Sequence, residues 1–242
     1  MATEPRTDKQ VHHVAHDVRT RHGTTRSDTV ERYNRRTRWF HAATYVSVLL
    51  LLGTGWWLLL GNEGDPSPLS RLLGTPDTVL HTNVGWFFGA LVVVGLVIGA
   101  RAVRTFVVES LRVDKTDRRW LLGWPRAIVT GRFPRHEGHF DPGQRVLNVV
   151  LTLGLLVVVV SGLGMAWLSG GPAFAVLVRL HKWSTYLVTP LLIGHIVVAA
   201  GLLPGYRGVW RSMHLGGRLP ARVARRLWPA WYDRATRADS RD

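Results

Sequence analysis

Four apolar segments, each long enough to cross a lipid bilayer, dominate the chain. They cover residues 39–60, 81–100, 146–168 and 178–203, and the first three contain no charged residue. The hydrocarbon core of a bilayer is about 30 Å thick and takes about 20 apolar residues in a helix. Because backbone polar groups must be satisfied inside lipid, helices are the form that such segments take. The sequence therefore predicts an all-α membrane protein, a bundle of four transmembrane helices.

The segments at the two ends of the chain are polar. Residues 1–38 predict a tail that is mobile in large part, and residues 204–242 predict a basic tail. The first tail carries a cluster of histidines, namely His12, His13, His16 and His22. We favour a solvated tail over a metal site for this cluster. The first apolar run is too long for a cleaved signal peptide and lacks a cleavage context.

Positive charge follows a regular pattern along the chain. The 242 residues include 31 Lys and Arg and have a formal net charge of +15. Nine of these basic residues lie in 1–40, ten in 101–145 and nine in 204–242. These segments alternate with the spans, as the positive-inside rule describes. We expect both termini on the cytoplasmic side of a bacterial plasma membrane, and we do not interpret the charge as nucleic-acid binding.

The fourth apolar segment contains two histidines, His181 and His195. Fourteen residues on a helix turn through about 1400°, about 40° short of four full turns, so both rings project from nearly the same face. They stand about 21 Å apart along the axis. Pro190 lies between them and can kink the helix. Because an imidazole in lipid is costly without a partner, both histidines are functional candidates.

Two further histidines match these in depth. His41 opens the first span at the inner surface, and His81 opens the second span at the outer surface. With cytoplasmic termini, His81 pairs with His181 and His41 pairs with His195. Each pair can give two axial nitrogens to one haem iron. The chain has no cysteine, which excludes disulfides, iron–sulfur clusters and c-type haem. We therefore predict two non-covalent haems b, against the alternative that the histidines only bond neighbouring helices.

At these residues the sequence resembles the cytochrome b (gamma) subunit of respiratory formate dehydrogenase, over roughly residues 32–235. The matching features are Arg35-Arg36-x-Arg38-x-x-His41, His81, Gly143-Gln144, His181-x13-His195 and Trp231-Tyr232. The resemblance implies that two haems b carry electrons from an outer iron–sulfur subunit to a quinone near the inner surface. Formate oxidation would belong to a catalytic molybdenum or tungsten subunit.

The resemblance also implies a quinone site beside the inner haem. In that family the site has an Asn-x-Gly-Gln type stretch, and here the matching residues are Asp141, Gly143 and Gln144, with Pro142 between them. A carboxylate and an amide at the inner surface suit a quinone that takes up protons. The alternative is that Asp141 caps the third span and Pro142 occupies its first helical position.

Basic residues flank the histidines. Arg179 and Lys182 stand beside His181, and Arg38 precedes His41. Such residues can pair with haem propionates near the membrane surfaces. They can equally serve as ordinary interfacial anchors.

Two other functions remain open from the sequence. One is a related four-helix cytochrome b that serves a hydrogenase or another periplasmic oxidoreductase. The other, from a different class, is a haem-free membrane scaffold or transporter. An absorption spectrum of the purified protein would separate the two classes.

Reporter fusions test the expected orientation. A reporter that works only in the cytoplasm should be active when fused after Asp242, because basic segments stay inside. The same reporter placed within residues 61–80 should be silent. A silent Asp242 fusion together with an active fusion within residues 61–80 would contradict the orientation.

Overall fold

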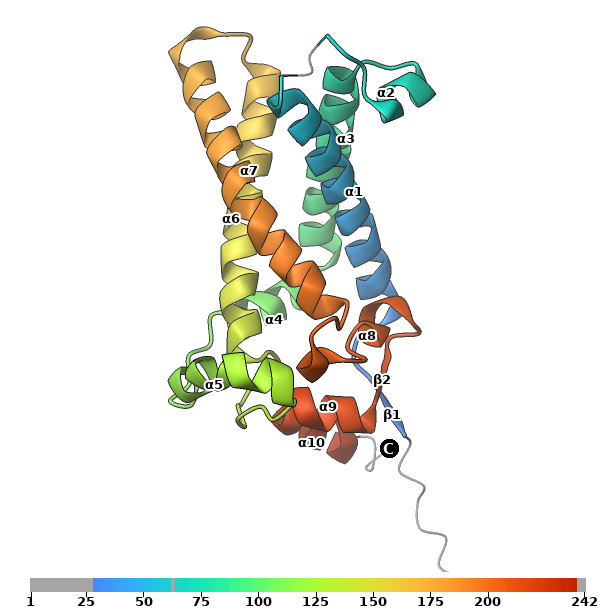
Figure 1. The fold of residues 1–242 in the computed structure, drawn as a ribbon, viewed down its shortest axis with the longest axis vertical. Helices are drawn as coiled ribbons and strands as arrows, with labels where there is room; N and C mark the ends of the chain where they lie inside the picture. Colours follow the sequence, from blue (N-terminus) through green and yellow to red (C-terminus); the bar gives the residue numbers. More distant parts are fainter. Residues whose placement is uncertain (1–27, 62–63, 239–242) are drawn as a thin grey trace, which may run out of the picture.

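The computed structural model describes residues 28–61 and 64–238. In this part of the chain four long helices stand side by side, with a folded cap at one end (Figure 1). They are α1 (Arg35–Leu59), α3 (Asp77–Ile98), α6 (Pro142–Trp167) and α7 (Gly171–Ala199). We call the end that carries residues 28–34 and 200–238 the capped end. The opposite end, with the short helix α2 (Pro68–Leu73), is the open end. The N-terminal histidine cluster lies outside the described residues.

Each long helix begins four to seven residues before the apolar run that predicts it. For α1 and α6 the reason is side-chain capping, because a helix starts where its first N–H groups find acceptors and not where lipid begins. The side chain of Asn34 accepts a hydrogen bond from the Thr37 N–H at 2.9 Å and starts α1. The side chain of Asp141 does the same for the Gln144 N–H and starts α6.

The fourth span ends differently from the expectation of residue 203. Helix α7 continues through Pro190 and ends at Ala199. The next segment, Pro204–His214, comprises η1 (Pro204–Tyr206) and α8 (Arg211–His214) and is bent from α7 by 59°. Helices α1, α3 and α6 are each long and apolar enough to cross a membrane, and α7 with this bent segment is the fourth candidate.

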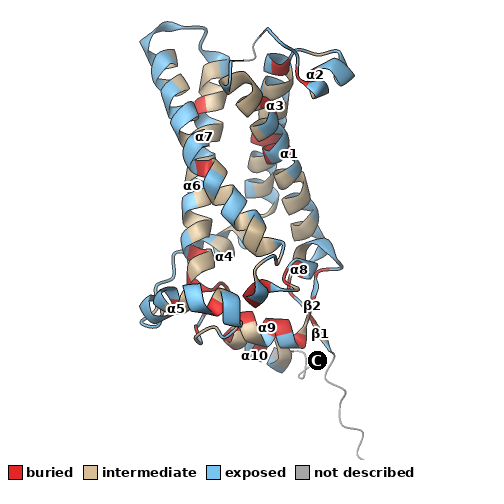
Figure 2. Cartoon of the chain, viewed as in Figure 1, coloured by how far each residue is buried: buried red, intermediate tan, exposed pale blue. Residues whose placement is uncertain are grey.

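The bundle consists of two helical hairpins. Helix α1 packs along α3, and α6 packs along α7, whereas packing between the hairpins is much sparser (Figure 1). Few side chains of the long helices are buried within the chain (Figure 2). Large apolar side chains face outward instead, such as Ile98 with 79% of its surface exposed. Surfaces of this kind need lipid, and the chain is a mostly helical membrane protein with a single pair of short strands in the described residues.

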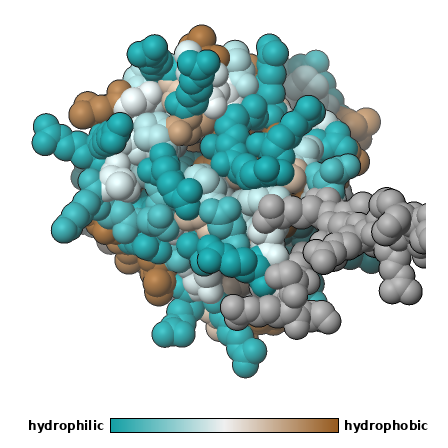
Figure 3. All heavy atoms as spheres, turned by 90° about the horizontal axis from the view of Figure 1, so that it is seen from below, coloured by the Kyte–Doolittle hydropathy of each residue, from teal (hydrophilic) through white to brown (hydrophobic). Residues whose placement is uncertain are grey.

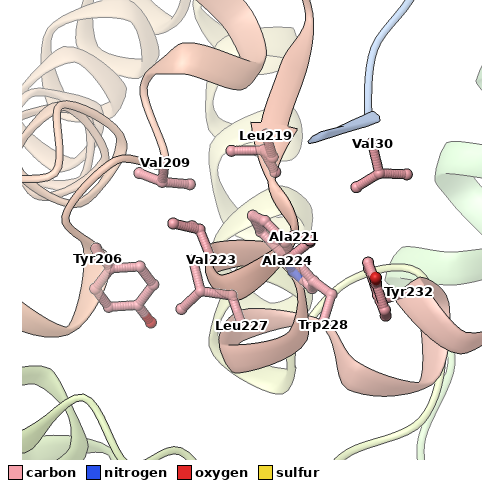
Figure 4. Close-up of a cluster of buried hydrophobic side chains, with 10 residues drawn as sticks. All are labelled: Val30, Tyr206, Val209, Leu219, Ala221, Val223, Ala224, Leu227, Trp228 and Tyr232. Carbon is pink, nitrogen blue, oxygen red and sulfur yellow. The ribbon is translucent and has the colours of Figure 1, made fainter. Parts of the chain in front are cut away.

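The cap corrects the expectation of a basic tail after residue 203. Strand β1 (Thr29–Glu31) pairs antiparallel with β2 (Arg218–Pro220), with Val30 opposite Leu219. Helices α9 (Ala221–Leu227) and α10 (Pro229–Ala238) follow. Apolar side chains of the strands, these helices and the segment after α7 form a buried cluster (Figure 4), whose members are Val30, Tyr206, Val209, Leu219, Ala221, Val223, Ala224, Leu227, Trp228 and Tyr232. Residues 204–238 and 28–34 therefore fold together as one unit.

Arg32 fastens this cap to the rest of the chain. Its guanidinium lies 4.4 Å from the ring centre of Trp228 and 4.3 Å from that of Trp231. It also donates a hydrogen bond to the His139 carbonyl at 2.6 Å. Burial lowers the pKa of Arg32 from its ordinary value. One side chain thus joins the N-terminal strand, the C-terminal helices and the segment that leads into α6.

The basic connection between α3 and α6 is also folded. It forms α4 (Ala100–Ser110) and α5 (Asp117–Thr130), and α5 crosses beneath the bundle (Figure 1). Buried Arg145 at the start of α6 holds this connection through ion pairs with Asp114 and Asp117, each at 3.1 Å. Seen from below, the capped end is covered mostly by hydrophilic side chains (Figure 3).

A substitution at Gly154 tests how closely α6 packs against α7. A Cβ at this position would lie 2.6 Å from the Cγ2 atom of Val188, which is buried. We expect Gly154→Ala to destabilise the protein by about 1–3 kcal/mol, because overpacking forces the helices apart. The measurement is thermal unfolding in detergent.

Gly194→Ala is the matched control, since nothing lies within 4 Å of a Cβ there. Alanine is the better helix former by about 1 kcal/mol, so this variant should be at least as stable as the wild type. Equal stability of the two variants would contradict the close packing.

Candidate functional site

The first pair of histidines lies toward the open end, between the two hairpins. His81 projects from α3 and His181 from α7, and their ring centres are 6.1 Å apart. The planes of the two rings are nearly perpendicular, at 85°. These residues are 100 positions apart in the chain, and each hairpin supplies one of them. We call them the open-end pair.

Each ring of the open-end pair contacts a hydroxyl of its own hairpin. The Nδ1 atom of His81 lies 2.9 Å from the Thr54 Oγ1 atom of α1. The Nδ1 atom of His181 lies 3.2 Å from the Ser161 Oγ atom of α6 and 3.0 Å from the Val158 carbonyl. The hydrogen bonds of both rings thus go to the neighbouring helix.

A glycine next to each hydroxyl makes room for the ring. A Cβ at Gly55 would lie 3.0 Å from the Cε1 atom of His81, and one at Gly162 would lie 3.1 Å from that of His181. Both distances are shorter than ordinary contacts of a side chain. The two glycines therefore let the imidazoles lie directly against α1 and α6.

A cavity of about 530 Å³ opens between the hairpins beside this pair. All four long helices line it, mainly with apolar side chains, together with both histidines and Lys182. Sites for small molecules and cofactors typically measure about 300–1,000 Å³ and are mostly apolar with a few polar groups. The volume and lining fit a flat, mainly apolar group held from two sides.

The second pair lies toward the capped end. His41 of α1 and His195 of α7 have ring centres 6.4 Å apart, and we call them the capped-end pair. A third histidine, His214 of α8, also lies 6.4 Å from His41. The Nδ1 atom of His41 is buried and has no hydrogen-bond partner among the described residues. This nitrogen makes no hydrogen bond within the described part of the chain, unlike the Nδ1 atoms of the open-end pair.

Both separations fit a metal ion between two imidazoles. Two metal–nitrogen bonds of about 2 Å each, with the distance from nitrogen to ring centre added on both sides, place the ring centres about 6 Å apart. The pairs measure 6.1 and 6.4 Å. In the described part of the chain, no three His, Asp or Glu side chains converge to hold a bare metal ion. Two imidazoles facing one another suit the iron of a haem.

The basic residues expected near the histidines lie in different settings. Lys182 and Arg179 are both exposed on α7, and Lys182 also lines the cavity of the open-end pair. Arg38, one turn before His41, is half-buried, and its Nε atom has no hydrogen-bond partner within the described residues. Lys182 and Arg38 therefore stand where an anionic substituent of a bound group could reach them.

Asp141, Gly143 and Gln144 lie at the capped end of α6. Asp141 is 4% exposed and accepts the Gln144 N–H at 2.9 Å, which makes it the helix cap. Burial raises the pKa of its carboxyl above the usual range, although the Gln144 N–H opposes this shift. A Cβ at Gly143 would lie 2.9 Å from the ring of Trp120. The Gln144 Oε1 atom is buried and lacks a hydrogen-bond partner among described residues.

The neighbours of Asp141 belong to the cap. The pKa of Tyr206 is raised by burial and by the nearby Asp141 carboxylate. The pKa of His139 is lowered to about 3 by burial and by the charges of Arg32 and Arg234. Asp141 thus lies in a buried polar network whose main role in the structure is to join α6 to the cap.

Sequence reasoning missed three residues of these sites, namely Thr54, Ser161 and His214. For Thr54 and Ser161 a signal existed, since each is a hydroxyl residue followed by glycine inside an apolar span. For His214 we find no such signal. It follows the spans in an arginine-rich segment, and the bend after α7 brings it beside His41.

Comparisons with known proteins agree with this geometry. A search of curated proteins found no match. The family model of the prokaryotic cytochrome b561 matches residues 32–216, more than half of the chain, and this range includes all five histidines of the two sites. The chain therefore belongs to the prokaryotic cytochrome b561 family of membrane electron-transfer proteins, which bind haem b.

Proposed function

We propose that this chain holds two haems b, one between His81 and His181 and one between His41 and His195. The observation that carries the proposal is the presence of two facing imidazole pairs, 6.1 and 6.4 Å apart, toward opposite ends of the bundle. Membership of a haem-b-binding family supports it. One cavity of suitable volume beside the open-end pair supports it further.

Haem supplies one-electron redox chemistry at its iron. Two imidazoles would hold the iron at each site, an arrangement that suits electron transfer and not the binding of small gases. The side chains that line the cavity are mainly apolar, and Lys182 adds a positive charge to the lining. Placing the two pairs toward opposite ends provides a route for electrons across the bilayer.

We propose that the capped end faces the cytoplasm, because the basic segments 28–40, 101–145 and 204–238 lie there (Figure 1). The open end then faces an outer partner. From the resemblance to the gamma subunit of formate dehydrogenase, we propose an iron–sulfur subunit as that partner, joined to a catalytic molybdenum or tungsten subunit. Co-purification of a hydrogenase subunit instead would favour the related cytochrome b of a hydrogenase complex.

The electron acceptor that we propose is a quinone at the capped end. Its support is the buried, unpartnered Gln144 Oε1 atom, which could accept a hydrogen bond from a quinol hydroxyl. Gly143 beside it keeps this stretch of α6 close to Trp120. Asp141 holds the N-terminus of α6 in place and thereby positions Gln144.

Haem content and absorption spectra of histidine variants test the two sites. We expect two haems b per chain in the purified protein. His81→Ala or His181→Ala should remove one spectral component, and His41→Ala should remove the other, because each haem loses one of two axial ligands. A wild-type protein without haem would contradict the function.

His195→Ala and His214→Ala together identify the partner of His41, since both rings lie near it. We expect His195→Ala to abolish the low-spin spectrum of the capped-end haem and His214→Ala to preserve it. The opposite result would move the ligand role to His214. Loss of the same spectral component in the His41 and His81 variants would contradict the pairing itself.

Quinol formation tests the acceptor site. We expect Gln144→Leu to slow quinol formation by on the order of 10-fold or more while both haems stay reducible by the upstream donor, because a buried acceptor that binds the quinol is lost. Asp141→Asn keeps the helix cap but removes the carboxyl group. The variant therefore separates the role of Asp141 in positioning Gln144 from a role in proton transfer to the quinone. An unchanged rate identifies Asp141 as a cap, and a slower rate assigns its carboxyl a part in proton uptake.

A further inference from the structure

The two hairpins repeat one local arrangement around the open-end pair. In each hairpin the first helix supplies a hydroxyl residue followed by glycine, and the second helix supplies the histidine. Thr54 and Gly55 of α1 receive His81, and Ser161 and Gly162 of α6 receive His181. Both hydroxyl residues are buried, Thr54 at 4% and Ser161 at 2% exposed. Two unrelated stretches of sequence thus provide the same surroundings for two rings.

The direction of the hydrogen bonds follows from the helices. The Thr54 hydroxyl donates its proton to the Leu50 carbonyl at 2.8 Å, and the Ser161 hydroxyl donates to the Val157 carbonyl at 2.6 Å. Each hydroxyl has one proton to give, so toward the imidazole each oxygen can only accept. The Val158 carbonyl near His181 is also an acceptor. The Nδ1 atom of each ring must therefore carry the hydrogen, which leaves Nε2 as the free lone pair.

From this arrangement we propose that Thr54 and Ser161 are positioning residues that hold His81 and His181 as iron ligands through Nε2 and lower the reduction potential of the haem between them. The inference rests on the proposed function, because it requires a haem at the open-end pair. Thr54 and Ser161 thereby join the site, where they orient the two rings and also influence the reduction potential.

The effect on the potential comes from the electron density of the ligand. An imidazole that donates its Nδ1 hydrogen to an acceptor becomes a more basic ligand at Nε2. A more basic ligand stabilises the oxidised iron over the reduced iron, and outer hydrogen bonds of this kind are one of the means by which a protein sets a haem potential. Thr54 and Ser161 therefore favour the oxidised state at the open-end site.

In the capped-end pair, one of the two rings lacks a hydrogen bond at Nδ1. The Nδ1 atom of His41 is buried without a hydrogen-bond partner in the described part of the chain. A haem held by His41 thus lacks the ligand activation that both rings of the open-end pair receive. The difference makes the open-end haem the lower in potential, so electrons run downhill from the open end to the capped end.

Redox titration of Thr54→Val followed by absorption tests the proposal. Valine keeps the branched shape of threonine and removes the acceptor. We expect the midpoint potential of one haem component to shift upward and that of the other to stay at the wild-type value. Retention of the shifted haem during purification should fall by on the order of 10-fold, as for other losses of an outer hydrogen bond to a metal ligand.

Two control variants separate the electronic role from simple packing. Ser47→Ala removes a hydroxyl from the same helix that is equally buried and bonded to the Ala43 carbonyl, but Ser47 has no hydrogen bond to a histidine among the described residues. Thr54→Ser keeps the acceptor and loses only a methyl group. Both should retain wild-type potentials. Ser161→Ala should shift the same component as Thr54→Val in the same direction, because each variant removes the hydroxyl that accepts from one of the two rings.

The outcomes distinguish this inference from the proposed function. Wild-type protein without haem would contradict both. Wild-type protein with two haems, together with a fully loaded Thr54→Val variant whose potentials are unchanged, would overturn the role of Thr54 alone. An equal shift in Ser47→Ala would also overturn it. Should Thr54→Val fail to fold, the same titration on Thr54→Ala decides the matter, with an upward shift supporting the proposal and no shift refuting it.

Discussion

An imidazole placed among hydrocarbon chains has no water to bond, and this constraint governs the arrangement of the bundle. Each of the histidines in the spans needs a partner from another helix. His81 and His181 meet hydroxyls on α1 and α6 and face each other across the gap between the hairpins. The hairpins themselves make sparse contact, with a hydrogen bond from the Trp56 indole to Thr189 of 3.1 Å among the few links. The contacts between these polar side chains therefore help to set the position of one hairpin relative to the other.

The cap is subject to a related constraint, because it contains buried charged side chains that need partners. Its surface is strongly basic, yet its interior holds Arg32 between two tryptophans and Arg145 among carboxylates and carbonyls. Charged groups in such positions are stable only where partners surround them. The result is a rigid platform under α6, and the Asp141–Gln144 stretch stands at its edge. The position of Gln144 is set as much by the cap as by the membrane helices.

Much of this structure can be predicted from the sequence because the signals are periodic. Apolar run length gives the four helices, and the fourteen-residue step from His181 to His195 places both rings on one side of α7. The cap was not predictable in this way, since its apolar side chains alternate with arginines over short helices and strands of three residues. The roles of Thr54 and Ser161 depend on how α1 rotates against α3 and α6 against α7. That rotation is fixed by side-chain packing and is not encoded in any single segment.

The division of the bundle into two similar hairpins has a consequence for biogenesis. Thr54 and Gly55 lie in the same hairpin as His81, and Ser161 and Gly162 lie in the same hairpin as His181. Each hairpin can therefore enter the bilayer during synthesis with its imidazole already bonded, before the other half has been made. The four helices need not insert as a finished bundle. Docking of the two halves is left as a later step, in which His81 and His181 come together between the hairpins.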